Sequence, residues 1–531
     1  MNKQNLLTIL LGLALVIICL SPILKSGLYS DDLFNFQHKT LYIAAHPSNV
    51  YDLAVPNINY WKSIGRYTLV SFMLMEFVYK YFTSVESYKL FVWLMNILAV
   101  IAFLFYLSSL KIKINYGIWL VCFGAVTQFR ISYHDAFTSL NGMYQLLAVF
   151  IFTASALYAY SIYSGKYWML IFSALLFTLG ILESEIGLTT LILIPVTALI
   201  LKVPFKKFVL TLAPFVLIAM IYLGYTFWLR MNVNAQDAYI GLTSNFDFVS
   251  MRNLFYKQVF ASFPLSNLHG KFWIRIILFH QLQDVRNIVC ILFIALLSLL
   301  IYRYDFIQKK SESHDINWKF LLLSITIIVS PAVFILPSVK YQLEMKWGIG
   351  YLPVYIQNFG TATFIAYLIQ ICFYSRKWII QRFSNLIFIV IVSCSCILLL
   401  FNQALINSRS FTFAFPAQIV YETIKGGILN TCKEGSTILI GNDFFWKNPN
   451  NYSLIFKEIT HKEFTVLDAE NPIPASDSTD CYLLDCRPGK TVVVSLYKIN
   501  CIDKKPISLI QKVETACGID MIEEEKTIAN Y

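Results

Sequence analysis

The chain has few charged residues for its length. Of its 531 residues, 14% are Asp, Glu, Lys or Arg, whereas soluble domains carry about 25%. It also has no basic amphipathic stretch and no basic motif with interleaved aromatic residues, so its net charge of +11 gives no support for nucleic-acid binding. With 57% hydrophobic residues and a mean hydropathy of +0.61, the composition predicts a polytopic α-helical membrane protein.

Three other features are absent. No small-x-small cleavage site follows the apolar run 6–24, so we expect a signal anchor rather than a signal peptide. No internal repeat is visible, which gives no support to an inverted-repeat transporter. The polar tail has no Cys-x-x-Cys metal spacing, and its odd number of cysteines allows at most two disulfides. Those cysteines are Cys432, Cys481, Cys486, Cys501 and Cys517.

About eleven apolar runs predict membrane spans. They cover about 5–24, 88–110, 116–130, 138–163, 167–183, 186–201, 208–229, 286–304, 319–337, 351–374 and 384–402. From about residue 403 the sequence becomes more polar and contains short β-rich runs, such as Thr437–Ile440 and Thr491–Leu496. We therefore predict a membrane domain over 1–402 and a small α/β domain over 403–531.

The apolar run Tyr67–Phe82 decides the orientation. If it is re-entrant or lies in the interface, the basic loops that follow fall on the same side as Lys3, as the positive-inside rule requires. Its Glu76 and Lys80, spaced i and i+4, also suit an interface better than lipid. We therefore expect a cytoplasmic N-terminus, with 25–87, 230–285, 338–350 and the C-terminal tail outside the cytoplasm.

Two adjacent acids, Asp31 and Asp32, follow the first apolar run. Neighbouring carboxylates at a membrane surface repel each other and avoid lipid, so they favour an occupant such as a cation, a metal or a substrate proton. One of them could take the proton from an incoming hydroxyl. The alternative is a structural role at the start of a helix capped by Ser30.

Other polar residues fall in segments expected on the same side. Arg66, in Gly65-Arg66-Tyr67, could clamp a phosphate, or it could contact lipid headgroups only. Glu183 and Glu185 lie at a turn between two short apolar runs, where acids beside a span are functional by default.

Two further clusters complete the candidate set. His134 and Asp135 place an imidazole beside a carboxylate, but two ligands alone are weak evidence for a metal, and Asp135 could instead cap a helix. Lys340 and Lys346 could hold a phosphate and Tyr341 a sugar ring, or all three could belong to an aromatic belt with snorkelling lysines. We assign the acid pair to catalysis, the other candidates to substrate binding, and no residue to a metal.

Taken together, these features resemble the GT-C class of integral-membrane glycosyltransferases. That class has many spans, an acidic residue in the first outer loop, interfacial helices after it and often an outer C-terminal domain. The chain is similar to the Gtr-type bacterial O-antigen glucosyltransferases, in which an Asp-Asp pair and a Gly-Arg-aromatic element recur in that loop. Here they read Asp31-Asp32 and Gly65-Arg66-Tyr67. The chain has no Asp-x-Asp at the membrane rim, so a metal-dependent mechanism of the oligosaccharyltransferase kind is not implied.

The resemblance implies a hexosyltransferase of the bacterial inner membrane. Its donor would be a sugar such as glucose on a polyprenyl phosphate, and its acceptor would be an extracytoplasmic glycan or lipid acceptor, such as one of lipopolysaccharide. Transfer would invert the anomeric carbon, with Asp31 or Asp32 as the general base and no cofactor, and metal dependence is left open.

Three rival functions remain. A transporter or flippase of lipid-linked sugars would need polar residues in the middle of its spans, which are few here. An O-antigen polymerase or ligase would use a large arginine-rich outer loop, and 230–285 contains Arg230, Arg252 and Arg275. A non-catalytic envelope scaffold would bind a partner through the tail.

Overall fold

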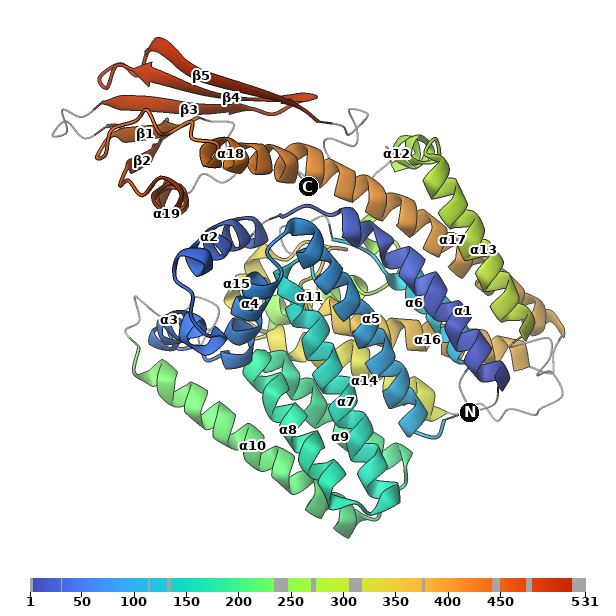
Figure 1. The fold of residues 1–531 in the computed structure, drawn as a ribbon. Coiled ribbons are helices and arrows are strands. Elements are labelled where there is room, and N and C mark those ends of the chain that lie inside the picture. Colours follow the sequence, from blue (N-terminus) through green and yellow to red (C-terminus); the bar gives the residue numbers. More distant parts are fainter. Residues whose placement is uncertain are drawn as a thin grey trace. The chain divides into compact units, whose positions relative to one another are not determined.

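The structure, a computed structural model, describes residues 3–29, 31–112, 115–130, 135–233, 247–268, 274–304, 318–374, 378–441, 449–473 and 480–517. It is mostly helical, with a small sheet near the C-terminus (Figure 1). The chain divides into two compact units. The first contains Met1–Leu24, Ala54–Met75 and Lys89–Ala404, and the second contains Lys25–Leu53, Glu76–Tyr88 and Leu405–Tyr531.

Helices make up most of the described chain. In chain order they are α1 (Lys3–Leu20), η1 (Ser21–Lys25), α2 (Asp31–Ala45), α3 (Val50–Ser63), α4 (Leu69–Tyr81), α5 (Val85–Ser109), α6 (Tyr116–Val126), η2 (Leu140–Gly142), α7 (Met143–Ser164), α8 (Tyr167–Glu183), η3 (Glu185–Leu188), α9 (Thr189–Ile200), α10 (Phe205–Met231), α11 (Phe248–Phe260), η4 (Ser266–Leu268), α12 (Ile274–Gln281), α13 (Val285–Tyr302), α14 (Trp318–Ile335), α15 (Val339–Glu344), α16 (Val354–Tyr374), α17 (Trp378–Arg409), the π-helical turn η6 (Ser410–Ala414), α18 (Phe415–Lys425) and α19 (Pro449–Thr460).

Eight helices in the described part of the chain are long and apolar enough to cross a bilayer. Three more apolar helices are shorter: Tyr116–Val126, Tyr167–Glu183 and Glu185–Ile200. They coincide with the expected spans 116–130, 167–183 and 186–201, of which the first stops being helical after Val126. The prediction of a polytopic helical membrane protein is confirmed at this level.

The core of the first unit surrounds α6. This helix is buried on every side from Gly117 to Val126 and packs against α1, α13 and α16. Trp119 lies among aromatic rings, with its centroid 4.9 Å from that of Phe103 and 6.2 Å from that of Phe359. A helix that is apolar all round belongs in a protein interior, which explains why α6 can be short.

Helix α10 presents most of its apolar side chains outward instead. Leu210, Leu217, Ile221 and Trp228 are between 55% and 66% exposed. A row of large apolar side chains without a protein partner is costly in water and favourable in lipid. We therefore interpret this face of α10 as a lipid-facing surface.

The second unit contains a five-stranded mixed sheet (Figure 1). Its strands are β1 (Thr437–Ile440), β2 (Thr465–Asp468), β3 (Cys481–Arg487), β4 (Thr491–Ile499) and β5 (Pro506–Ala516), in the order β2-β1-β3-β4-β5. β1 is parallel to β2 and β3, and β3, β4 and β5 form an antiparallel meander. The two β-rich runs expected from the sequence are therefore strands.

Helices α18 and α19 bury one face of this sheet. The alternating residues Val492, Val494 and Leu496 of β4 share a core with Ile424 of α18 and Phe456 of α19. This period of two places one side of each strand in the core. Helix α2 also belongs to this unit, since it packs against α19.

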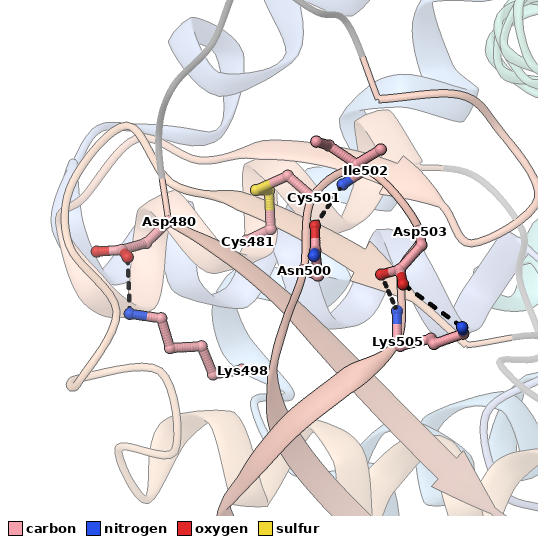
Figure 2. Close-up of a disulfide and its surroundings, with 8 residues drawn as sticks. All are labelled: Asp480, Cys481, Lys498, Asn500, Cys501, Ile502, Asp503 and Lys505. Atoms are coloured by element: carbon pink, nitrogen blue, oxygen red, sulfur yellow. Dashed lines mark hydrogen bonds and ion pairs between the residues drawn. A yellow bond between two sulfur atoms is a disulfide. The ribbon is translucent and has the colours of Figure 1, made fainter.

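A disulfide joins Cys481, at the start of β3, to Cys501, just after β4 (Figure 2). It closes a loop with a sequence separation of 20 residues. Beside it, Lys498 Nζ lies 2.8 Å from Asp480 Oδ1. Hydrogen bonds from Lys498 and Lys433 hold the pKa of Asp480 below its ordinary value. The bridge and the ion pair fasten the same end of the β3–β4 hairpin.

The segments expected to be outer loops contain several helices, of which the sequence predicted α4 and offered the start of α2 only as an alternative. The segment 25–87 contains α2 and α3 as well as the expected helix, which is α4, and 230–285 contains α11 and α12. Glu76 and Lys80 of α4 have partners other than the expected i, i+4 one. Glu76 is fully buried and pairs with Lys39 at 2.8 Å, and Lys80 Nζ donates to the carbonyl of Ser48 at 2.6 Å. Burial in the second unit therefore determines these contacts.

Candidate active site

The acid pair begins helix α2. The N-terminal turn of α2 favours negative charge, because the first backbone N–H groups of a helix have no partners within the helix. Asp32 is only 2% exposed, and Tyr88 Oη donates a hydrogen bond to its Oδ2 at 2.7 Å. The side chain of Asp31 and all of Ser30 lie outside the described part of the chain. Asp32 is therefore a buried, hydrogen-bonded carboxylate.

Arg66 lies in the turn between α3 and α4, directly after Gly65. Gly65 has a φ of +86°, and a Cβ there would come within 3.1 Å of Arg230 Cγ. The position therefore requires glycine. Arg230 Nε also donates to the carbonyl of Gly65 at 3.3 Å, so the end of α10 holds this turn. The conformation of Gly65 brings the next side chain, Arg66, beside Arg230.

Glu185 is the partner of Arg66. Its carboxylate accepts two hydrogen bonds from the guanidinium, Nε to Oε1 and Nη2 to Oε2, each at 3.3 Å. The two side chains are 24% and 27% exposed, so water reaches the pair. Trp61 lies against the same guanidinium, 5.5 Å from its central carbon to the ring centroid. This fork geometry is the one that arginine uses for carboxylates and phosphates.

A close backbone crossing positions the turn that carries Glu183 and Glu185. A Cβ on Gly187 of η3 would lie 2.4 Å from the carbonyl of Gly180 in α8. Glu183, at the end of α8, is 1% exposed, and Ser71 Oγ donates to its Oε1 at 3.4 Å. Its Oε2 is buried and has no hydrogen-bond partner among the described residues. The two acids therefore have different surroundings, one in an ion pair and one in the protein interior.

Arg66, Glu185 and Arg230 line a cavity of about 410 Å³ in the first unit. Two cations and one carboxylate leave one net positive charge on its wall. The hydroxyl of Ser338, which also lines the cavity, is buried without a hydrogen-bond partner in the described part of the protein. A buried hydroxyl without a partner costs free energy unless a ligand or water completes it.

The remaining wall of this cavity is largely apolar. It is formed by side chains of α10 and α14, including Leu223, Phe227, Phe334 and Ile335. A cationic end beside an apolar wall suits a ligand that carries an anionic group on a hydrocarbon chain.

The structure brings together only part of the predicted substrate-binding set. Tyr341 of α15 lines the cavity with Arg66 and Glu185, and its ring lies 4.1 Å from that of Tyr351. Glu183 precedes Glu185 by two residues and is not among the described residues that line the cavity. Lys340 and Lys346 do not line this cavity, as far as the described residues show.

Of the pair His134 and Asp135, the structure describes only the second residue. His134 lies outside the described residues, whereas Asp135 is fully buried. Asp135 accepts hydrogen bonds from the Thr138 hydroxyl at 2.7 Å and the Phe137 amide at 3.2 Å. These contacts are those of an Asx turn, so Asp135 acts in the structure as a turn-capping residue. No cluster of three or more potential metal ligands occurs in the described ranges.

Arg230 is the residue that sequence reasoning missed. From the sequence, Arg230 was considered only as one of the arginines of a large outer loop. A cation immediately after the apolar run 208–229 could have marked it as an anchor near the membrane surface. Its proximity to Arg66, 164 positions away in the sequence, could not be read from either segment alone.

The chain matches none of the protein-family models and none of the curated proteins with which it was compared.

Proposed function

We propose that this protein is a membrane glycosyltransferase that takes its sugar from a polyprenyl-phosphate donor. The observation that carries the proposal is the convergence of Arg66 and Arg230 on one cavity with apolar walls. A lipid-linked donor presents a phosphate to cations and an isoprenoid chain to apolar side chains. The cavity offers both.

In this proposal Glu185 holds the guanidinium of Arg66 until the donor binds. A phosphate oxygen pair can replace the carboxylate on the same fork, since both are planar or near-planar pairs of acceptors at similar spacing. Arg230 adds a second cation, and Ser338 a hydroxyl. The isoprenoid chain then follows Phe227 and Leu223 of α10 toward lipid.

The reaction follows as a single displacement with inversion. An acceptor hydroxyl oxygen forms a bond to the anomeric carbon while the bond from that carbon to the phosphate oxygen breaks. The hydroxyl proton goes to a carboxylate, and the electron pair leaves on polyprenyl phosphate. Because this leaving group is already a stable phosphate, the proposal includes no metal and no cofactor.

We assign the proton acceptor to Asp31 and a positioning role to Asp32. Asp32 is buried and accepts a hydrogen bond from Tyr88, which suits a residue that fixes the start of α2. A general base of this kind contributes a factor of about 10²–10⁴ to the rate.

The acceptor in the proposal is an extracytoplasmic glycan or lipid-linked glycan. The Cys481–Cys501 disulfide supports an oxidising compartment for the C-terminal domain, as in a bacterial periplasm. The protein would then lie in the bacterial inner membrane, with its N-terminus in the cytoplasm.

The test measures transfer of radiolabelled glucose from a polyprenyl-phosphate donor to envelope polysaccharide in membranes that express this chain alone. We expect Asp31→Asn to reduce transfer about 100-fold or more. Asp503→Asn, a change to an exposed acid of the tail, should leave the rate unchanged. Wild-type rates in both Asp31→Asn and Asp32→Asn would refute the mechanism. Movement of the labelled lipid without a new glycosidic bond would indicate a flippase.

A further inference from the structure

A second cavity, of about 790 Å³, lies wholly within the second unit. It is lined by residues of α2, of α18 and of the chain that leads into α5. The two helices meet beside it, because Leu41 of α2 and Tyr421 of α18 pack against the same hydrophobic core. Its volume falls in the range of about 300–1,000 Å³ that ligand pockets occupy.

One polar side chain of this cavity, that of Gln37 in α2, is almost fully buried. It lines the cavity and is only 6% exposed. Its Nε2 is buried without a hydrogen-bond partner among the described residues. An amide donor left in this state costs about 1–3 kcal/mol unless a ligand or a water supplies an acceptor, so this donor is available to a ligand that enters the cavity.

The charges on the cavity wall are balanced. Lys25 and Lys425 contribute two cations, and Glu86 and Glu422 two carboxylates. The cavity that contains Arg66 differs, because it carries a net positive charge. A balanced wall does not favour an anion such as a phosphate, and suits a neutral ligand with both donors and acceptors.

Aromatic and amide groups complete the surface. Phe415 and Tyr421 of α18 contribute rings, and Gln418 lies between them on the same helix. Gln418 Nε2 donates to Glu422 at 2.8 Å, which leaves the amide oxygen as an acceptor. Rings that accept the C–H face of a sugar, beside amides and carboxylates that bind its hydroxyls, are the groups that recognise a carbohydrate.

We propose that this cavity is a binding site for the acceptor glycan, which it recognises as a neutral polyhydroxyl chain. The proposal rests on the proposed function, since it identifies the second substrate of the same transfer. Gln37 donates from its Nε2 to a sugar oxygen, and Glu86 and Glu422 accept from sugar hydroxyls. Its volume gives room for more than one sugar ring.

The first experiment measures binding without any donor. The full-length protein in detergent is titrated with short oligosaccharides released by mild acid from the envelope polysaccharide of the expressing strain, and binding is followed by calorimetry. We expect Gln37→Leu and Gln418→Ala each to weaken binding about 5- to 10-fold, the effect of one lost hydrogen bond. Gln511→Ala, at an exposed position of β5, is the matched control and should bind as wild type.

Melting temperature separates a binding role from a structural one. Because Gln37 Nε2 has no partner on the described residues, Gln37→Leu should melt at or above the wild-type temperature while it loses affinity. Unchanged affinity in both cavity variants would overturn the proposal, as would equal binding of a peptide mixture and the oligosaccharides.

Kinetics then connects the cavity to transfer. The same variants should raise the KM for the acceptor and leave the KM for the polyprenyl-phosphate donor unchanged. A protein that binds the oligosaccharides but transfers no sugar would overturn the proposed function and leave the binding site standing. If the protein transfers sugar, and the Gln37→Leu and Gln418→Ala variants keep the wild-type KM for the acceptor, the binding site would be overturned and the proposed function would stand.

Discussion

Removing Glu185 should tighten the binding of a lipid phosphate, whereas removing Arg66 should weaken it. In the structure the carboxylate and the guanidinium form a fork with both hydrogen bonds at 3.3 Å. A ligand phosphate can use that fork only after Glu185 leaves it. The substitution Glu185→Gln removes this competition and keeps the size of the side chain.

The magnitude follows from distance and exposure. At 3.3 Å and an effective dielectric constant of about 20, the Coulomb attraction is about 5 kcal/mol before desolvation is subtracted. Fully exposed pairs retain about 0.2–1 kcal/mol of net stability. This pair is about a quarter exposed, so we take the upper end, about 1 kcal/mol. Glu185→Gln should therefore lower the Kd about fivefold.

Arg66→Gln removes a charge-assisted bond worth about 1.5–3 kcal/mol, of which the pair with Glu185 already used about 1 kcal/mol. The net loss of about 0.5–2 kcal/mol corresponds to a Kd raised about 2- to 30-fold. In the Arg66→Gln background, Glu185→Gln should have little further effect. This non-additivity distinguishes competition for one fork from two independent contacts.

The assay measures the Kd of polyprenyl phosphate for the full-length protein in detergent at low and moderate salt. Arg286→Gln is the matched control, because Arg286 also forms a fork with a carboxylate, that of Asp284, but is 75% exposed on α13. A weaker Kd in Glu185→Gln would refute the reasoning, since Glu185 would then contact the donor directly.

Three further predictions concern stability. Lys39→Met removes the cation that pairs with the fully buried Glu76, so it should lower the free energy of unfolding by about 3–5 kcal/mol; adding Glu76→Leu should restore most of this in thermal melts, and no rescue would contradict the burial argument. Cys481→Ser with Cys501→Ser opens the loop and should cost about 3 kcal/mol in denaturant unfolding, and an unchanged midpoint would contradict the loop-closure account. Burial, and to a lesser extent the nearby Lys39, lowers the pKa of His38 below its ordinary 6.5, so the unfolded chain binds the proton more readily than the folded one. The melting temperature of the wild type should therefore fall as the pH drops below about 6.5, and it should fall less in His38→Gln. An equal fall in both proteins would assign the effect to other groups.

The membrane helices were predictable because length and apolarity alone identify them. The expected run 88–110 corresponds to α5, Val85–Ser109, and the expected run 208–229 lies within α10, Phe205–Met231. The helix α3 was missed, and the start of α2 was only an alternative interpretation, for the opposite reason. Their sequences are mixed in polarity, and their helical form depends on packing within the folded units, which no single segment encodes.

The candidate site was predictable as a set of residues and not as a set of contacts. Arg66 and Glu185 were each selected for their charge near a membrane surface, but their pairing joins positions 119 apart in the sequence. Gln37 carried no signal at all, because a glutamine in a mixed segment looks like any solvated residue. Only burial without a partner makes it informative.

The contact between Gly180 and Gly187 has a consequence for how this protein tolerates change. Neither residue has a side chain that could bind a substrate, yet any larger residue at 187 would force the backbones of α8 and η3 apart and shift Glu185 away from Arg66. In a library of random variants selected for activity, position 187 should be as intolerant as the charged residues themselves. The position of Glu185 in the cavity therefore depends on the absence of a side chain at Gly187 as much as on the charged residues themselves.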